Sequence, residues 1–144
     1  MVVQPVIVSI LLLSLLAVLK KDRSALAGIA LTTNTSILTS LANDYGYDVV
    51  FSRQVEALGK KNDVVLGIST SGKAKNVALG IKQAKKMGIK TVALSGGDGG
   101  DIIKLADVSL VVPSKITARI QEAHITIAHI ICEMIEQELC KEQK

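Results

Sequence analysis

Apolar and polar positions follow two different periods along this chain. Short runs rich in Val, Ile and Leu are typical of buried strands, and apolar residues every three or four positions are typical of helices. The sequence predicts strands at residues 26–33, 63–68, 90–96 and 107–114. It predicts helices at residues 35–46, 52–63, 73–88 and 117–142, with a short one at 100–106.

Strands that alternate with helices are typical of βαβ units, in which helices flank a parallel sheet. Thr35 or Ser36 is expected to cap the first of these helices, and Gly46 and Gly88 to end two of them. Pro113 weakens the end of the last strand. We therefore expect a three-layer α/β fold with a long C-terminal helix, and one domain over residues 1–144.

The segment 6–21, VIVSILLLSLLAVLKK, is apolar almost throughout. A membrane-spanning helix needs about 20 apolar residues, and this segment is marginal because Ser9 and Ser14 interrupt it. A secretory signal has basic residues before its apolar part, and none precedes Val6. A buried helix or strand is the simpler alternative.

Composition and charge narrow the range of functions. The chain has one Phe, two Tyr, no Trp and a net charge of +4. Nucleic-acid binding usually combines a basic patch with stacking aromatic residues, so nucleic acid is not expected as a partner. Cys132 and Cys140 share one predicted helix and are expected to be reduced thiols of a cytoplasmic protein.

Three hydroxyl residues, Ser69, Thr70 and Ser71, follow the strand that ends at Ile68 and precede Gly72. Ligands of open α/β sheets bind at the carboxyl ends of strands, and a helix N-terminus attracts anions. Gly72 allows close approach of the backbone to a ligand. This loop therefore predicts a phosphate site, with helix capping by Ser71 as the alternative. The dinucleotide and hydrolase glycine patterns are both absent from it.

Two further regions carry candidate chemistry. The stretch SGGDGGD at 95–101 suits either a tight turn beside a ligand or a flexible loop. Gln121, His124 and His129 lie on the predicted C-terminal helix, where a histidine is usually a core or capping residue. Gln121 and His129 are separated by about 12 Å along a straight helix. They share one metal ion only if the helix is irregular at Gln121 or a neighbouring subunit contributes.

The chain resembles the phosphoheptose isomerase family, which has the sugar isomerase (SIS) fold. The similarity rests on ISTSG, ALSGGDGG, VVPS, LANDYGY and TARIQEAHITIAHIICEMIE, and it extends from about Lys20 to the C-terminus. The resemblance implies a cytoplasmic, tetrameric isomerase that interconverts sedoheptulose 7-phosphate and D-glycero-D-manno-heptose 7-phosphate. Such enzymes supply heptose for lipopolysaccharide of the cell envelope, have sites between subunits, and often bind zinc.

The resemblance also assigns roles to single residues. Ser69, Thr70, Ser71 and Gly72 match the phosphate loop, and Ala74 stands where many members have another phosphate-binding serine. Asn43 and Asp44 match two residues that contact the sugar. Gln121 and His129 match two zinc ligands. Gln121 also belongs to the substrate-binding residues, and His129 is also a catalytic acid/base.

The first 19 residues depart from the family, which has an N-G-G-S-x-x-x-x-Q-H-x-x-x-E motif just before KKDR. In that register Ile10 replaces a zinc-binding His, and Ser14 replaces a Glu that is both zinc ligand and general base. Back-translation with synonymous codons, read one base out of frame, yields NGGSASDCQHFAAEFTGRF. We therefore hypothesise that residues 1–19 are a frame-shifted reading of an active-site helix, which sequencing the DNA across Lys20 tests.

The sequence leaves two functions open. The first is a sugar-phosphate isomerase whose activity is impaired by Ile10 and Ser14, with zinc binding weakened by the two missing ligands. The second is a non-catalytic SIS module that binds sugar phosphates or a protein, as in the relatives that associate with replication initiators. In either case the apolar residues of the C-terminal helix predict packing between subunits.

Overall fold

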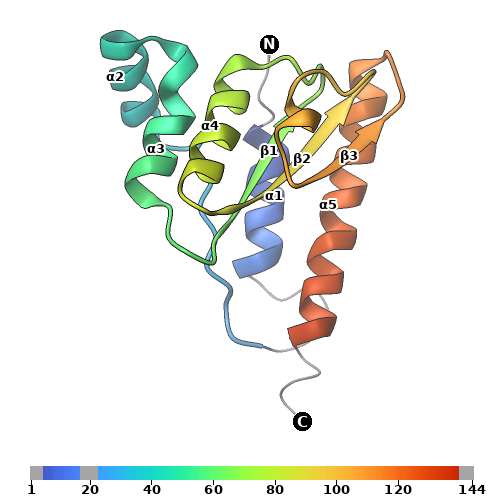
Figure 1. Cartoon of the computed structure of the whole chain (residues 1–144). Helices are drawn as coiled ribbons and strands as arrows, with labels where there is room; N and C mark the ends of the chain where they lie inside the picture. Colours follow the sequence, from blue (N-terminus) through green and yellow to red (C-terminus); the bar gives the residue numbers. More distant parts are fainter. Residues whose placement is uncertain (1–4, 17–22, 140–144) are drawn as a thin grey trace.

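The computed structural model describes residues 5–16 and 23–139 (Figure 1). Its sheet contains three parallel strands in the order β1-β2-β3: β1 (Val64–Ser69), β2 (Lys90–Gly96) and β3 (Val108–Val112). In this register Ile68 lies opposite Leu94, and Ser95 lies opposite Val111. Three of the four predicted strands are therefore confirmed.

Helices cover both faces of the sheet, so the predicted three-layer α/β architecture is confirmed (Figure 1). One layer contains α1 (Pro5–Leu16) and α5 (Thr117–Leu139). The opposite layer contains α3 (Val50–Leu58), α4 (Lys75–Lys86) and the short 3₁₀ helix η2 (Ile102–Lys104). Helix α2 (Thr35–Tyr45) and the 3₁₀ helix η1 (Tyr47–Val49) precede α3.

Side chains alternate between the two faces of the central strand and fill a core on each. Ala93 faces α4 and packs with Phe51, Val77 and Ile81. Its neighbour Leu94 faces the other layer and packs with Ile68 of β1 and Ala128 of α5. Burial on both faces explains why β1 and β2 read as nearly continuous apolar runs.

The predicted strand at 26–33 is wrong, because this segment has no strand partner among the described residues. Its backbone bonds elsewhere: the Leu26 N–H donates to the carbonyl of Leu15 in α1 at 3.1 Å, and the Thr33 N–H donates to the Ala30 carbonyl at 3.4 Å. An apolar run forms a strand only when another strand accepts its hydrogen bonds.

Several helix ends also differ from expectation. Asn34 caps α2 in place of Thr35 or Ser36, since its Oδ1 accepts the Ile37 N–H at 3.0 Å. The predicted helix at 52–63 starts two residues earlier and ends at Leu58. Beyond it the Lys60 N–H donates to Asp63 Oδ2 at 2.9 Å, which closes a turn instead of continuing the helix. The predicted stops near Gly46 and Gly88 are confirmed.

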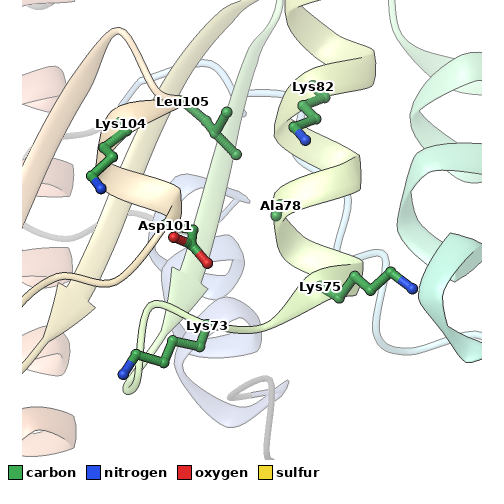
Figure 2. Close-up of a pocket in the computed structure, with 7 residues that line it drawn as sticks. All are labelled: Lys73, Lys75, Ala78, Lys82, Asp101, Lys104 and Leu105. Carbon is green, nitrogen blue, oxygen red and sulfur yellow. The ribbon is translucent and has the colours of Figure 1, made fainter.

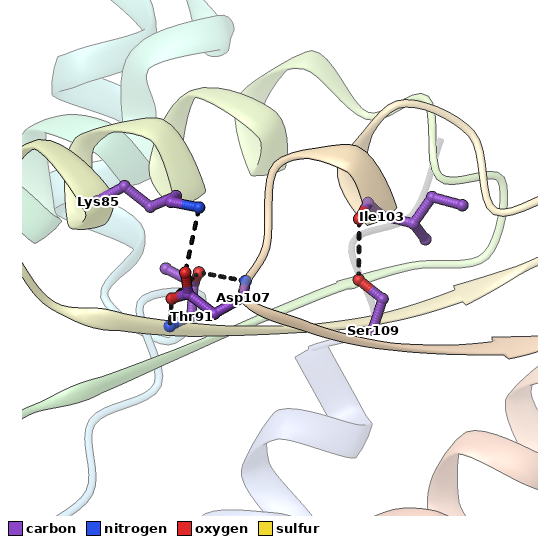
Figure 3. Close-up of polar contacts among 5 residues, drawn as sticks. All are labelled: Lys85, Thr91, Ile103, Asp107 and Ser109. Carbon is purple, nitrogen blue, oxygen red and sulfur yellow. Dashed lines mark hydrogen bonds and ion pairs between the residues drawn. The ribbon is translucent and has the colours of Figure 1, made fainter.

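Asp107 fixes the start of β3 to β2 and α4 (Figure 3). Its Oδ2 accepts hydrogen bonds from the backbone N–H and Oγ1 of Thr91, both at 2.8 Å. Lys85 Nζ lies 3.1 Å from Oδ1. The Thr91 hydrogen bonds, followed by the Lys85 contact, lower the pKa of Asp107 to about 2.

The apolar N-terminal segment forms α1, which packs against α5. Arg23 joins the two helices from beyond the end of α1: Nη2 donates to the Ser14 carbonyl at 3.0 Å, Nη1 donates to Leu15 at 2.9 Å, and Nε lies 3.3 Å from Glu136 Oε1. Within the described residues, no helix is both long and apolar enough to cross a membrane. The alternative of a helix is confirmed for residues 5–16, but its burial is only partial: Ser14 is buried, whereas Leu13 is 65% exposed and Leu16 is 53% exposed.

Candidate functional site

The hydroxyl-rich loop lies where the sequence placed it, at the carboxyl end of β1 and before α4. Ser69 is the last residue of β1 and is buried, Thr70 is half-buried, and Ser71 is exposed. The three hydroxyl groups therefore range from the sheet interior to the surface. Ser71 Oγ accepts a hydrogen bond from the Lys73 N–H at 3.3 Å.

Helix capping does not explain these hydroxyl groups. Helix α4 begins after Ala74, which makes no side-chain capping bond, and the Val77 N–H of its first turn donates to Asn76 Oδ1 at 2.9 Å, so Ser71 does not cap it. A helix start carries backbone N–H groups without helical partners and a partial positive charge. The alternative that Ser71 caps the helix is thus wrong, and the loop's hydroxyl groups stay close to a helix start that favours an anion.

Gly72 holds this loop against the glycine-rich loop after β2. It has a φ of +65°, and a Cβ added to it would lie 1.9 Å from the Gly99 carbonyl oxygen. Its own carbonyl accepts hydrogen bonds from the N–H groups of Asp101 at 2.9 Å and Ile102 at 3.2 Å. Gly72 therefore makes its close approach to the backbone of Gly99. That Gly72 also lets the backbone approach a ligand stays a prediction.

The second loop, 95–101, is an ordered turn. Ser95 Oγ donates to the Gly99 carbonyl at 2.9 Å, and the Gly100 N–H donates to Asp98 Oδ1 at 3.0 Å. These bonds set the position of Gly99, against which Gly72 packs. Of the two readings of SGGDGGD, the structure supports a tight turn beside the hydroxyl-rich loop.

His124 of α5 contacts the loop at residues 95–101, and the sequence did not reveal this contact. Its side chain is fully buried, and Nε2 lies 3.0 Å from the Ser95 carbonyl oxygen. Burial lowers the pKa of His124, an effect that the hydrogen bond to Ser95 partly opposes. The neutral ring then donates from Nε2. A buried core histidine and a histidine that positions a loop look alike in sequence.

The remaining predicted site residues lie apart within one protomer. Gln121 is half-buried and His129 is exposed, and α5 is regular from Thr117 to Leu139. They are thus separated by about 12 Å along the helix axis. Asn43 Nδ2 donates to Asp44 Oδ1 at 3.1 Å at the exposed end of α2, on the far side of the sheet from α5 (Figure 1).

The described residues of one protomer do not form a metal centre. Over residues 5–16 and 23–139, no three His, Cys, Asp or Glu side chains are grouped to hold an ion. Ser14 is buried in α1, and a serine hydroxyl is not a ligand that zinc prefers. Gln121 and His129 alone do not fit a zinc ion within one protomer.

Cys132 is not a candidate nucleophile. It is fully buried in α5, and burial raises the pKa of its thiol, although the nearby Arg23 charge opposes the effect. A buried protonated thiol is a poor nucleophile. The prediction of a reduced thiol agrees with this site, and Cys140 lies outside the described residues.

The fold and the two interlocked loops define a parallel α/β domain of the SIS class. The sequence profile of the SIS domain matches residues 11–96. The chain is 58% identical over 118 residues to the phosphoheptose isomerase of Sulfurimonas denitrificans, covering 82% of this chain and 60% of that protein. It is 60% identical over 117 residues to the probable phosphoheptose isomerase of Thermoplasma acidophilum, covering 81% and 64%.

Solved structures give the same result. The chain superposes on a phosphoheptose isomerase from Francisella tularensis with a TM-score of 0.88 and 37% identity, covering 92% of this chain and 71% of that one. The enzyme from Neisseria gonorrhoeae gives a TM-score of 0.86 and 43% identity over the same shares. The chain therefore belongs to the phosphoheptose isomerase family of SIS-domain proteins. It spans 60% and 64% of the length of the two curated relatives named above.

Proposed function

We propose that this chain is a sugar-phosphate isomerase of the cytoplasm that acts on sedoheptulose 7-phosphate and D-glycero-D-manno-heptose 7-phosphate. The observation that carries the proposal is the hydroxyl-rich loop, Ser69–Gly72, which directly precedes the start of α4. Family membership supplies the substrate class, since the relatives are named phosphoheptose isomerases. The product serves synthesis of heptose for lipopolysaccharide.

In this proposal the phosphate group lies at the loop. The hydroxyl groups of Ser69, Thr70 and Ser71 donate hydrogen bonds to phosphate oxygens, and the start of α4 adds its positive end. Gly72 keeps the loop in place through its contact with Gly99. Asn43, Asp44 and Gln121 contact the sugar, which requires that a neighbouring subunit brings some of them to the loop.

Isomerisation moves a proton from the carbon beside the carbonyl through an enediol. His129 is proposed to exchange a proton with the carbonyl or hydroxyl oxygen of the sugar. The carbon proton requires a separate base, and Ser14 occupies the register of the family's glutamate. A serine hydroxyl is a much weaker base near neutral pH than a glutamate carboxylate.

Turnover by this chain is therefore proposed to be low, while phosphate binding is kept. General-base catalysis is worth about 10²–10⁴-fold. An assay with sedoheptulose 7-phosphate should show turnover reduced by at least about 10²-fold relative to a frame-restored protein that carries the NGGS motif and its upstream residues. Equal turnover of the two proteins would show that Ile10 and Ser14 do not occupy those positions.

We propose zinc as a cofactor only of an assembled or frame-restored protein. The donors proposed from this chain are Gln121 and His129, and they do not converge within one protomer. No catalytic step is routed through a metal here. Zinc titration of both proteins tests the point, with stoichiometric binding expected for the frame-restored protein alone.

A second candidate function is a non-catalytic SIS module that binds sugar phosphates or a protein partner. The burial of Ser14 favours it, because this position then serves packing and not proton transfer. Binding of sedoheptulose 7-phosphate without turnover, in a protein with an intact fold, is the result that distinguishes this candidate from the isomerase.

A further inference from the structure

The side chain of His124 is completely buried where α5 meets the end of β2. Its Nε2 lies 3.0 Å from the Ser95 carbonyl oxygen. Its Nδ1 is also buried, and among the described residues this atom has no hydrogen-bond partner. Because a carbonyl oxygen can only accept, the proton of the neutral ring is on Nε2, and Nδ1 keeps an unpaired acceptor site.

An apolar side chain would fill the same space without an unpaired nitrogen. A buried acceptor that has lost water and gained no donor costs free energy, and positions inside a protein therefore usually hold apolar residues. Ile120 and Ala128, one turn to either side of His124 among the buried residues of α5, are apolar in this way. The hydrogen bond to Ser95 is thus what His124 supplies and what a leucine would not.

Ser95 is the residue at which α5 and both loops meet. Its Oγ donates to the Gly99 carbonyl at 2.9 Å. A Cβ added to Gly72 would lie 2.6 Å from this Oγ and 1.9 Å from the Gly99 carbonyl oxygen. Ser95 therefore forms part of the surface against which Gly72 packs, and it also holds the rest of that surface in place.

Gly96, the next residue, is also enclosed by the hydroxyl-rich loop and α5. A Cβ added to it would lie 2.6 Å from the Thr70 carbonyl oxygen and 2.4 Å from Ile120 Cδ1. The hydroxyl-rich loop and α5 therefore both pack against the backbone at the end of β2. A shift of this backbone relative to α5 moves the surface on which the loop rests.

The second loop also returns to the hydroxyl-rich loop after Gly99. The Asp101 N–H donates to the Gly72 carbonyl at 2.9 Å, and Figure 2 shows Asp101 beside the turn that leads into α4. A continuous series of contacts therefore joins α5 to the hydroxyl-rich loop: His124 to Ser95, Ser95 to Gly99, and Gly99 to Gly72.

We propose that His124 is a positioning residue for phosphate binding. Its hydrogen bond to Ser95 holds the second loop, which in turn holds Gly72 and the hydroxyl groups beside it. Hydroxyl groups that are already in place bind an anion more tightly than groups that must be ordered when it binds. The inference rests on the proposed function and extends it to a buried residue of α5 that acts on the loop through its neighbours.

Hydrogen exchange of the chain without ligand tests the positioning. The amides of Asp101 and Ile102 both donate to Gly72, and their protection should fall about tenfold in His124→Leu. It should fall less than about twofold in His124→Gln, because glutamine keeps an N–H donor. The amides of Gly59 and Ile89, near the start of β2, should change less than about twofold in both variants. An equal fall at all four amides would overturn the proposal, since His124 would then only stabilise the whole fold.

Calorimetric titration with sedoheptulose 7-phosphate tests the consequence for binding. His124→Leu and Ser95→Ala should each weaken binding about tenfold, and His124→Gln should stay within about twofold of the unmodified chain. The double variant His124→Leu/Ser95→Ala should lose less than the product of the two single losses, because both changes act through Gly99. The matched control Cys132→Ala changes another buried position about two turns along α5 and should leave the affinity within about twofold.

Unchanged affinity in a folded His124→Leu, or an equal loss in Cys132→Ala, would overturn the proposal. If His124→Leu does not fold, Ser95→Ala decides, because it removes a single oxygen atom from the same series of contacts. Absence of binding to the unmodified chain would instead overturn the proposed phosphate site. Hydrogen exchange needs no ligand and would still decide whether His124 positions the loop, so the two failures are distinguishable.

Discussion

At the scale of single residues, the hydroxyl groups of Ser69 and Ser71 are the part of the loop most open to test. Ser69→Ala/Ser71→Ala should weaken binding of sedoheptulose 7-phosphate, since hydrogen bonds to a charged group are worth about 1.5–3 kcal/mol each. Calorimetry gives the affinity, and circular dichroism shows whether the fold is kept. The control Ser36→Ala/Ser40→Ala removes two exposed hydroxyl groups from α2. Unchanged affinity in the loop variant would remove these side chains from the phosphate site.

His124 predicts a pH dependence of stability. Its pKa is lowered in the folded chain, so as pH falls below about 6.5 the unfolded chain takes up a proton before the folded chain does. The free energy of unfolding should therefore decrease with falling pH, and His124→Gln should reduce that slope. Urea denaturation between pH 7.5 and 5.5 measures it. Identical slopes in the two proteins would contradict a neutral, buried His124.

Local sequence was sufficient to find the loop but not what supports it. The run Ser69, Thr70, Ser71 stands out because three neighbouring hydroxyl residues exceed what one helix cap needs. The contact of Gly72 with Gly99 joins two loops that are 27 positions apart, and no local pattern encodes it. The roles proposed for Asn43, Asp44, Gln121 and His129 rest on family resemblance and stay predictions.

At the scale of elements, Arg23 connects α1 to α5. Its side chain is only 3% exposed and that of Glu136 only 1%, and removal of one partner leaves the other charge buried. Arg23→Met should therefore reduce the free energy of unfolding by about 3–5 kcal/mol. Chemical denaturation measures the loss. The control Arg53→Met breaks an exposed ion pair with Glu56 and a contact with the Tyr45 ring, and should cost no more than about 2 kcal/mol. A similar small loss in both variants would show that Arg23 does not hold the helices together.

Elements were predictable wherever their own residues decide their structure. Strand β2 was predicted residue for residue, because it is buried between two neighbours and bounded by turns. The segment 26–33 has a similar apolar composition, but a strand also needs a partner, which composition does not supply. The sequence of residues 26–33 would suit a strand, but the described residues provide no neighbouring strand with which it could pair.

At the scale of the whole molecule, the outer surface predicts association. One side of α5 is buried on the sheet and α1, as Ala128 and Cys132 show, whereas Ile130 is 51% exposed and Met134 is 62% exposed. Val108 and Leu110 of β3 are also exposed and lie on the face of the sheet that α5 covers, because Leu110 pairs with Leu94, which packs on α5. Exposed apolar residues of this kind are typical of an interface between subunits.

We therefore expect a dimer or tetramer at micromolar concentration by light scattering. Ile130→Glu/Met134→Glu should shift the protein toward a monomer, because two charges cannot be buried in an apolar interface without partners. The control Leu58→Glu places a charge at an exposed apolar position at the end of α3 and should leave assembly unchanged. A monomeric unmodified chain would contradict the expected interface and, with it, a site completed by a neighbouring subunit.

The backbone contact at Gly72 also sets how this gene tolerates change. A library of random substitutions should separate the glycines into two groups according to the space beside them. Gly72 should accept no other residue, since any Cβ overlaps the Gly99 carbonyl. Gly88 also has a positive φ, but no atom lies within 4 Å of a Cβ placed there, so asparagine should survive selection for folded protein. The contact between the two loops therefore fixes the residue at position 72, whereas position 88, beyond the other end of α4, can vary.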